Sequence, residues 1–125
     1  MRLALSLTVA ILMVGSFAWA SNNNSNVAAK KTVKEVMKAG MAGDNSLFKK
    51  VAGGSASAEE KAKLLDLLID LLENDAPKGD TVEWKMASGT AMVAAAKLVI
   101  GREGALDELK AAANCKACHD KFKGK

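Results

Sequence analysis

Apolar side chains recur every three or four residues from about residue 27 onward, which is the period of an amphipathic α-helix. Glycine, proline and polar clusters divide this pattern, and no segment alternates between apolar and polar residues as a half-buried strand does. We expect a short helical turn over 44–54 and four long helices, over about 27–42, 57–76, 80–100 and 105–125. The pattern predicts an all-α fold, an antiparallel four-helix bundle with up-down-up-down topology.

The expected helix starts carry residues that cap helix N-termini. Ser25 and Asn26 precede the first helix, and Asp80 precedes the third. Ser57 and Glu60 have the S-x-x-E spacing of a capping box directly before the second. These residues therefore predict where the long helices begin.

Rows of apolar residues predict which face of each helix is buried. Leu64, Leu68 and Leu71 form such a row on the second long helix. On the third, we expect the buried face to follow the row formed by Val82, Met86, Gly89, Val93, Ala96 and Ile100.

The first twenty residues have a different pattern, with Arg2, an apolar run and then the small-x-small sequence Ala18-Trp19-Ala20. We interpret residues 1–20 as a secretory signal peptide that is cleaved after Ala20, so the mature chain would be periplasmic. An uncleaved membrane anchor is the alternative. No later segment has eighteen uninterrupted apolar residues, so we expect no membrane span in the mature chain.

The mature part is expected to be one domain over 27–125 after a flexible leader over 21–26, because its length suits a single core. The full chain has 18 Lys and Arg and 14 Asp and Glu, with a formal net charge of +4. These charges are interspersed and form no arginine-rich patch with aromatic residues, which argues against nucleic-acid binding. The sequence also lacks a Ser/His/Asp set and a phosphate-binding glycine loop, so we expect no enzymatic activity and assign no catalytic residue.

Both cysteines and the only histidine of the chain lie together near its C-terminus, as Cys115, Cys118 and His119. C-x-x-C-H is the attachment sequence of c-type haem. On a helix these positions share one face, so the thiols can add across two porphyrin vinyl groups while the imidazole binds iron. We expect one covalent haem c with His119 as axial ligand. A dithiol that exchanges with a partner is the alternative, which the missing thioredoxin-like pattern disfavours.

A second protein ligand to the iron would have to come from earlier in the chain, because only six residues follow His119. The sixth position on the iron could instead be filled by a lysine or be left empty. The methionine candidates are Met37, Met41, Met86 and Met92.

The segment "CKACHDKFK" at the end of a signal-bearing chain of four helices resembles class II cytochromes c, the cytochrome c′ group and its low-spin relatives. In that family an aromatic and a basic residue follow the histidine at the positions of Phe122 and Lys123. A further basic residue corresponds to Lys125. The phrase "VMKA", here over 36–39, also occurs in the first helix of small members.

The resemblance implies that haem is attached on the C-terminal helix. In low-spin members a methionine of the first helix is the sixth ligand, which points to Met37, with Met41 as the alternative. High-spin members have an apolar residue in that place. The chain departs from the family pattern at Val33, where a basic residue usually stands one turn before the methionine.

We therefore expect a one-electron carrier, and a five-coordinate haem protein that binds nitric oxide or carbon monoxide is the alternative. A redox subunit of a larger dehydrogenase differs only in its partner. Trp84 and Phe122 are expected to pack on the porphyrin, with a plain core role as the alternative. The resemblance also allows a homodimer through the first two helices. An acidic redox partner would dock at a lysine-rich haem face formed by Lys110, Lys116, Lys121, Lys123 and Lys125.

Overall fold

The structure, a computed structural model, describes residues 29–125, and this part of the chain is helical and contains no strand. The all-α prediction is therefore confirmed. None of the helices within 29–125 has the length and apolar character needed to cross a bilayer. The predicted signal peptide, the leader and the first two residues of the expected domain lie outside the described residues. The elements are α1 (Val33–Val36), the π-helical segment η1 (Met37–Met41), α2 (Leu47–Ala52), α3 (Ala58–Glu73), α4 (Thr81–Val99), α5 (Ala105–Ala112) and α6 (Cys115–Phe122).

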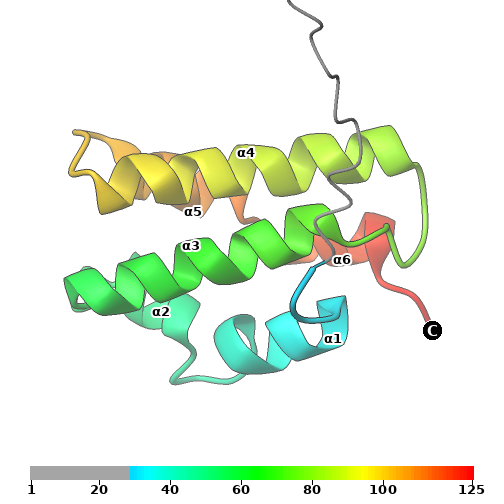
Figure 1. Cartoon of the computed structure of the whole chain (residues 1–125), viewed down its shortest axis with the longest axis horizontal. Coiled ribbons are helices and arrows are strands. Elements are labelled where there is room, and N and C mark those ends of the chain that lie inside the picture. Colours follow the sequence, from blue (N-terminus) through cyan, green and yellow to red (C-terminus); the bar gives the residue numbers. More distant parts are fainter. Residues whose placement is uncertain (1–28) are drawn as a thin grey trace, which may run out of the picture.

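Helices α3 and α4 lie side by side, run in opposite directions and form the most extensive contact between elements of residues 29–125 (Figure 1). Helix α5 packs against α4, while α1, η1 and α2 pack against α3. Helix α6 returns to the beginning of α4, where Phe122 contacts Trp84. The two ends of the described chain therefore lie at the same end of the helix pair α3–α4 (Figure 1).

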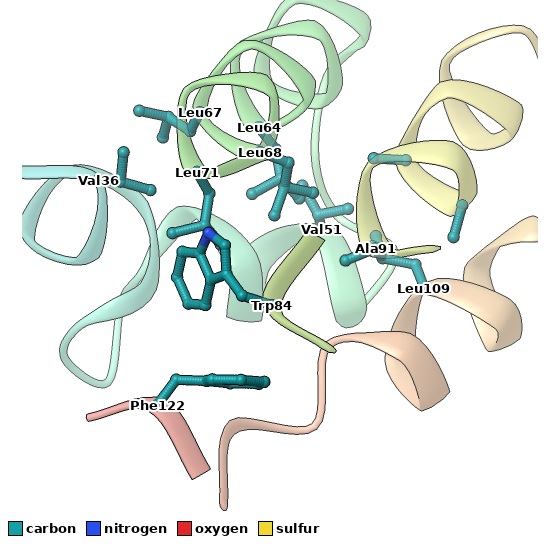
Figure 2. Close-up of a cluster of buried hydrophobic side chains, with 12 residues drawn as sticks. Val36, Val51, Leu64, Leu67, Leu68, Leu71, Trp84, Ala91, Leu109 and Phe122 are labelled. Carbon is teal, nitrogen blue, oxygen red and sulfur yellow. The ribbon is translucent and has the colours of Figure 1, made fainter. Parts of the chain in front are cut away.

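Leucines of α3 form the centre of the core, as their spacing predicts. Leu64, Leu68 and Leu71 are buried, and Leu67 widens the row. Around them lie buried side chains from the other elements, including those of Val36, Val51, Trp84, Ala91, Leu109 and Phe122 (Figure 2). Burial of one such large side chain contributes about 1.5–3 kcal/mol to folding, so this row fixes where the other helices pack.

The first helix begins later than expected. Thr32 is its N-cap, and Thr32 and Glu35 form a reciprocal capping box in which the Thr32 N–H donates to the Glu35 carboxylate at 2.8 Å. Residues 29–32 are not helical. The expected start near residue 27 is therefore wrong for these residues, because a complete capping box at Thr32 sets the boundary.

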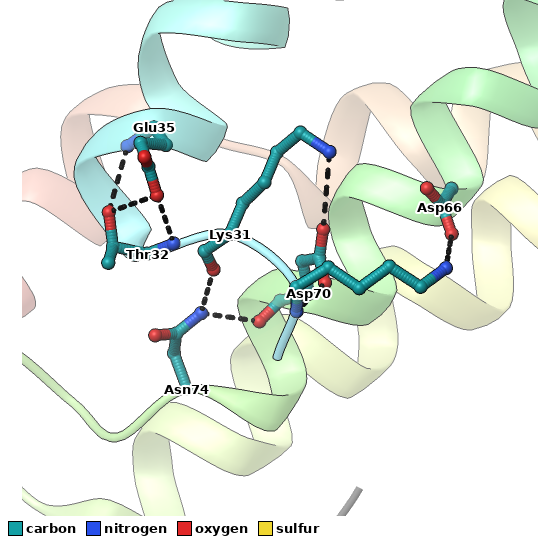
Figure 3. A network of polar contacts seen from close by, with 7 residues as sticks. Lys31, Thr32, Glu35, Asp66, Asp70 and Asn74 are labelled. Atoms are coloured by element: carbon teal, nitrogen blue, oxygen red, sulfur yellow. Dashed lines mark hydrogen bonds and ion pairs between the residues drawn. The ribbon is translucent and has the colours of Figure 1, made fainter. Parts of the chain in front are cut away.

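Polar contacts hold the segment before α1 against the end of α3 (Figure 3). The backbone N–H of Lys30 donates to the Asp70 carboxylate at 2.7 Å, and the Asn74 side-chain amide donates to the carbonyl of Lys31 at 2.7 Å. Asp70 is buried, with the Lys31 ammonium 4.0 Å from its second oxygen. These contacts fix the direction in which the chain enters α1 and η1.

The expected continuous C-terminal helix over 105–125 is wrong, because the chain breaks between α5 and α6. Ala113 leaves the helical conformation, with φ −92° and ψ 50°. Asn114 then caps a new helix, and its side chain accepts a hydrogen bond from the backbone N–H of Ala117 at 3.0 Å. The C-x-x-C-H segment therefore occupies a short helix of its own.

The expected buried face of α4 is also wrong. Val82, Met86, Val93 and Ile100 keep 66, 68, 48 and 69% of their surface exposed. The buried residues of α4 are Trp84, Ser88, Ala91, Ala94 and Ala95. Both rows have helical spacing, and the row with small side chains is the one that allows α3 and α5 to approach closely.

Candidate functional site

A cavity of about 470 Å³ lies at the end of the molecule where α6 meets η1 and α4. Its volume is within the range of roughly 300–1,000 Å³ typical of small-molecule sites. Leucine and alanine side chains of α3, α4 and α5 complete its wall. Seven of the side chains that the sequence selected as candidate site residues line this one cavity, namely Met37, Met41, Trp84, Cys115, Cys118, His119 and Phe122.

Helix α6 forms one wall and carries the two thiols and the imidazole on one face. Asn114 caps the first turn, so Cys115 is the first helical residue and Cys118 and His119 follow one turn later. Both cysteines are free, Cys115 exposed and Cys118 half-buried. Burial raises the pKa of the Cys118 thiol, and the nearby Cys115 raises it further. His119 is exposed at the rim of the cavity.

The π-helical segment η1 contributes the two methionines. Its wider turn closes with a hydrogen bond from the backbone N–H of Ala42 to the carbonyl of Met37 at 2.8 Å. Single π-helical turns are frequent at functional sites. Met37 and Met41 are half-buried, and both border the cavity. The first and last residues of this turn are therefore available to whatever occupies the cavity.

Two aromatic side chains close the cavity near the start of α4. The rings of Trp84 and Phe122 meet edge to face, with centroids 5.3 Å apart and an interplanar angle of 77° (Figure 2). The Trp84 indole N–H donates to the carbonyl of Asn74 at 2.9 Å. This pair joins α6 to α4, and such a contact contributes about 0.5–1.5 kcal/mol beyond its buried area. Both rings are core residues and also face the cavity.

Apart from Trp84, the sequence did not identify the part of the wall that α4 supplies. Ala87, Ser88 and Ala91 line the cavity next to Trp84. The Ser88 hydroxyl donates to the carbonyl of Trp84 at 2.7 Å, so this buried polar group is satisfied within its own helix. The signal was the helical spacing of these small side chains, which the bulkier row of α4 obscured.

Two of the four candidate methionines lie elsewhere. Met86 and Met92 line an open groove between α4 and α5, outside the cavity. Within the described residues, Met37 and Met41 are the methionines that border it.

Three of the five lysines expected at the docking face form ion pairs. Lys116 lies 2.6 Å from Asp120, Lys121 lies 3.0 Å from Glu83, and Lys110 lies 3.6 Å from Asp107. The other two, Lys123 and Lys125, are exposed and make no ion pair with any residue in 29–125. The positive charge of this face is therefore partly compensated.

Comparison with protein family models, curated proteins and solved structures finds no significant match. The donor set of the cavity itself fits a covalently attached haem. Two thiols and an imidazole stand on one wall, two thioethers on another, and the rest of the lining is mainly apolar. These are the side chains that attach and ligate c-type haem.

Proposed function

We propose that this chain is a periplasmic monohaem c-type cytochrome that carries one electron between redox partners. One observation supports this most strongly: a single cavity is bordered by Cys115, Cys118 and His119 from α6 and by Met37 and Met41 from η1. Residues more than seventy positions apart in the sequence converge there. This convergence is what a haem with one histidine and one methionine ligand requires.

Each side chain has a role that its chemistry defines. Cys115 and Cys118 would hold the haem through two thioethers, because their S–H bonds can add across the two vinyl groups without an oxidant. The imidazole of His119 would bind the iron. The mainly apolar wall, with the Trp84–Phe122 pair, would shield the part of the haem that it covers from water. When bound, the haem supplies the one-electron couple.

We assign the sixth ligand to Met37, with Met41 as the alternative. A thioether opposite an imidazole raises the reduction potential and keeps the iron low-spin, which suits electron transfer. The resemblance to low-spin class II cytochromes c favours Met37, and the position of both methionines at the cavity is compatible with either. An empty sixth position would make the protein a binder of nitric oxide or carbon monoxide instead.

The proposed fold is an antiparallel four-helix bundle in which α1 with η1, α3, α4, and α5 with α6 form the four legs. The contacts of α3 with α4 and of α4 with α5 support this arrangement. The chain direction alternates along these legs in Figure 1. The break at Asn114 divides the last leg and brings α6 to the cavity.

A redox partner with an acidic surface would dock beside α6. Lys123 and Lys125 supply positive charge that no residue in 29–125 compensates, and long-range attraction of this kind raises association rates.

Absorption spectra of the purified holoprotein and of two matched variants test the proposal. The oxidised wild type should show the weak long-wavelength band that accompanies methionine ligation of ferric haem. Met37→Ala should abolish this band and allow the reduced protein to bind carbon monoxide. Met41→Ala removes the other thioether of the same turn and should leave the band in place.

Other outcomes would change the conclusion in defined ways. Loss of the band in Met41→Ala alone would move the ligand to Met41. A high-spin wild type that binds carbon monoxide would favour the gas-binding alternative. Purified protein without a haem spectrum would refute the proposed function.

A further inference from the structure

The exposed apolar row on α4 has the spacing of a coiled-coil seam. Its six members are separated by four, three, four, three and four residues: Val82, Met86, Gly89, Val93, Ala96 and Ile100. Alternating steps of three and four are the a and d positions of a heptad repeat, which keep one face of a helix toward a partner helix. The row extends from the first turn of α4 to its C-cap.

Residues 29–125 leave the four large side chains of this seam, those of Val82, Met86, Val93 and Ile100, largely exposed, while Gly89 and Ala96 are half-buried. The core contacts of α4 come from its other side, through residues such as Trp84, Ala91 and Ala95. A helix that is apolar on all sides is normally buried on all sides. The seam instead borders an open groove of about 780 Å³ between α4 and α5, which Met86, Gly89 and Val93 help to line. Exposing these apolar side chains to water costs free energy, so we expect a protein partner to cover them.

We propose that the occupant is a second copy of this chain, with the two α4 helices packed antiparallel across a two-fold axis. In this register Val82 meets Ile100 of the second copy. The same register places Met86 against Ala96 and Gly89 against Val93. Two of these layers therefore pair a large side chain with a small residue, and the Val82–Ile100 layer pairs two branched apolar side chains. Both copies use the same patch.

Charge complementarity selects this partner and this direction. Glu83 and Lys97 flank the seam at equivalent positions, one near each end, so antiparallel pairing brings Glu83 opposite Lys97 of the second copy. Within one chain, Glu83 pairs with Lys121 at 3.0 Å and Lys97 pairs with Glu108 at 2.7 Å. Glu83 and Lys97 stay about half exposed. The dimer would join these pairs into two networks of alternating charge, whereas parallel pairing would bring no Glu83–Lys97 contact.

This interface differs from the one that the resemblance implies, which uses the first two helices. It is also independent of the haem proposal, because none of the six seam residues lines the cavity. The two proposals can therefore fail separately.

Sedimentation equilibrium of the purified protein tests the dimer. The wild type should form a dimer with a measurable dissociation constant. Val93→Glu places a charge in the centre of the seam and should weaken dimerisation by about a hundredfold or more. Ala62→Glu introduces the same charge at an exposed position of α3 and should leave the dissociation constant unchanged. Circular dichroism checks that each variant stays helical.

A charge exchange tests the antiparallel direction without altering the apolar seam. Lys97→Glu should weaken the dimer, because it faces Glu83 of the second copy with a like charge. Adding Glu83→Lys, Glu108→Lys and Lys121→Glu reverses every charge of both networks, keeps the two ion pairs within each chain, and should restore most of the loss. A wild type that is monomeric at all concentrations would overturn the proposal. So would a dimer that tolerates Val93→Glu, or one whose Lys97→Glu defect the full charge reversal does not repair.

Discussion

Gly40 illustrates how one absent side chain positions the candidate methionines. It lies inside η1, between Met37 and Met41, and is buried against α3. A Cβ atom at this position would lie 2.6 Å from Cδ1 of Leu67, which is too close for two carbon atoms. Glycine therefore allows η1 to approach α3, and this approach brings both thioethers to the cavity.

Gly40→Ala should lower the free energy of unfolding by about 1 kcal/mol, because overpacking of about 1–3 kcal/mol outweighs the better helix propensity of alanine. Denaturant titration measures the change. In a Leu67→Ala background the clashing atom is absent, so the same substitution should be neutral or stabilising. An equal loss in both backgrounds would show that contact with Leu67 is not the cause.

The proposed haem-attachment residues could be selected from the sequence because the C-x-x-C-H spacing is local, and the structure adds that all three border one cavity. Because the three residues lie within about one helical turn, their sequence spacing alone places them on one face of a helix. The choice between Met37 and Met41 could not be read in this way, because the π-helical turn places both at the cavity. A hydrogen bond between residues five apart has no clear signature in the sequence.

Among the elements, α3 begins where its sequence predicts. Its capping box is confirmed: the Ser57 side chain accepts from the Glu60 N–H, and the Glu60 carboxylate accepts from the Ser57 N–H at 2.8 Å. The same carboxylate pairs with the Lys50 ammonium of α2. Hydrogen bonding to Lys50, followed by the bond from the Ser57 N–H, holds the pKa of Glu60 below its usual value.

This lowered pKa predicts a specific acid sensitivity. The stability that the carboxylate contributes is present above the ordinary glutamate pKa of 4.5 and is lost as the pH falls through the lower folded-state pKa. Glu60→Gln keeps a hydrogen-bond acceptor but removes the charge. The variant should therefore be less stable at neutral pH and lose less stability on acidification. Denaturant titrations across the pH range measure this.

Glu59→Gln is the control for that experiment. It removes a neighbouring carboxylate that makes no hydrogen bond with any residue in 29–125. The pH dependence of its stability should match that of the wild type over the acid range. If Glu60→Gln also follows the wild type, the capping carboxylate does not contribute to acid unfolding.

Helix boundaries and buried faces could be predicted where the sequence offered a single candidate. The capping box of α3 was the one candidate for its start, and the leucine row was the one candidate for its buried face. Helix α4 carries two apolar rows, and the sequence favoured the bulkier one, whereas packing uses the row with small side chains. The break before α6 depends on Asn114, which caps the new helix. The apolar pattern continues across this position, so the sequence contains no sign of the break.

At the scale of the whole molecule, contacts in several elements position the two segments that line the cavity. The polar contacts of Asp70 and Asn74 direct the chain into η1, and the cap at Asn114 directs it into α6. The two segments that bear the candidate ligands then meet at one end of the α3–α4 pair. The account of function therefore depends on a haem that is covalently bound in this cavity.

Intact-mass measurement of the exported protein tests this central claim most directly. The account predicts a polypeptide beginning at Ser21 whose mass is increased by that of one haem, with the added mass on the peptide that contains Cys115, Cys118 and His119. A variant carrying both Cys115→Ser and Cys118→Ser should lack the added mass. An exported wild-type protein with the mass of the polypeptide alone would contradict the account.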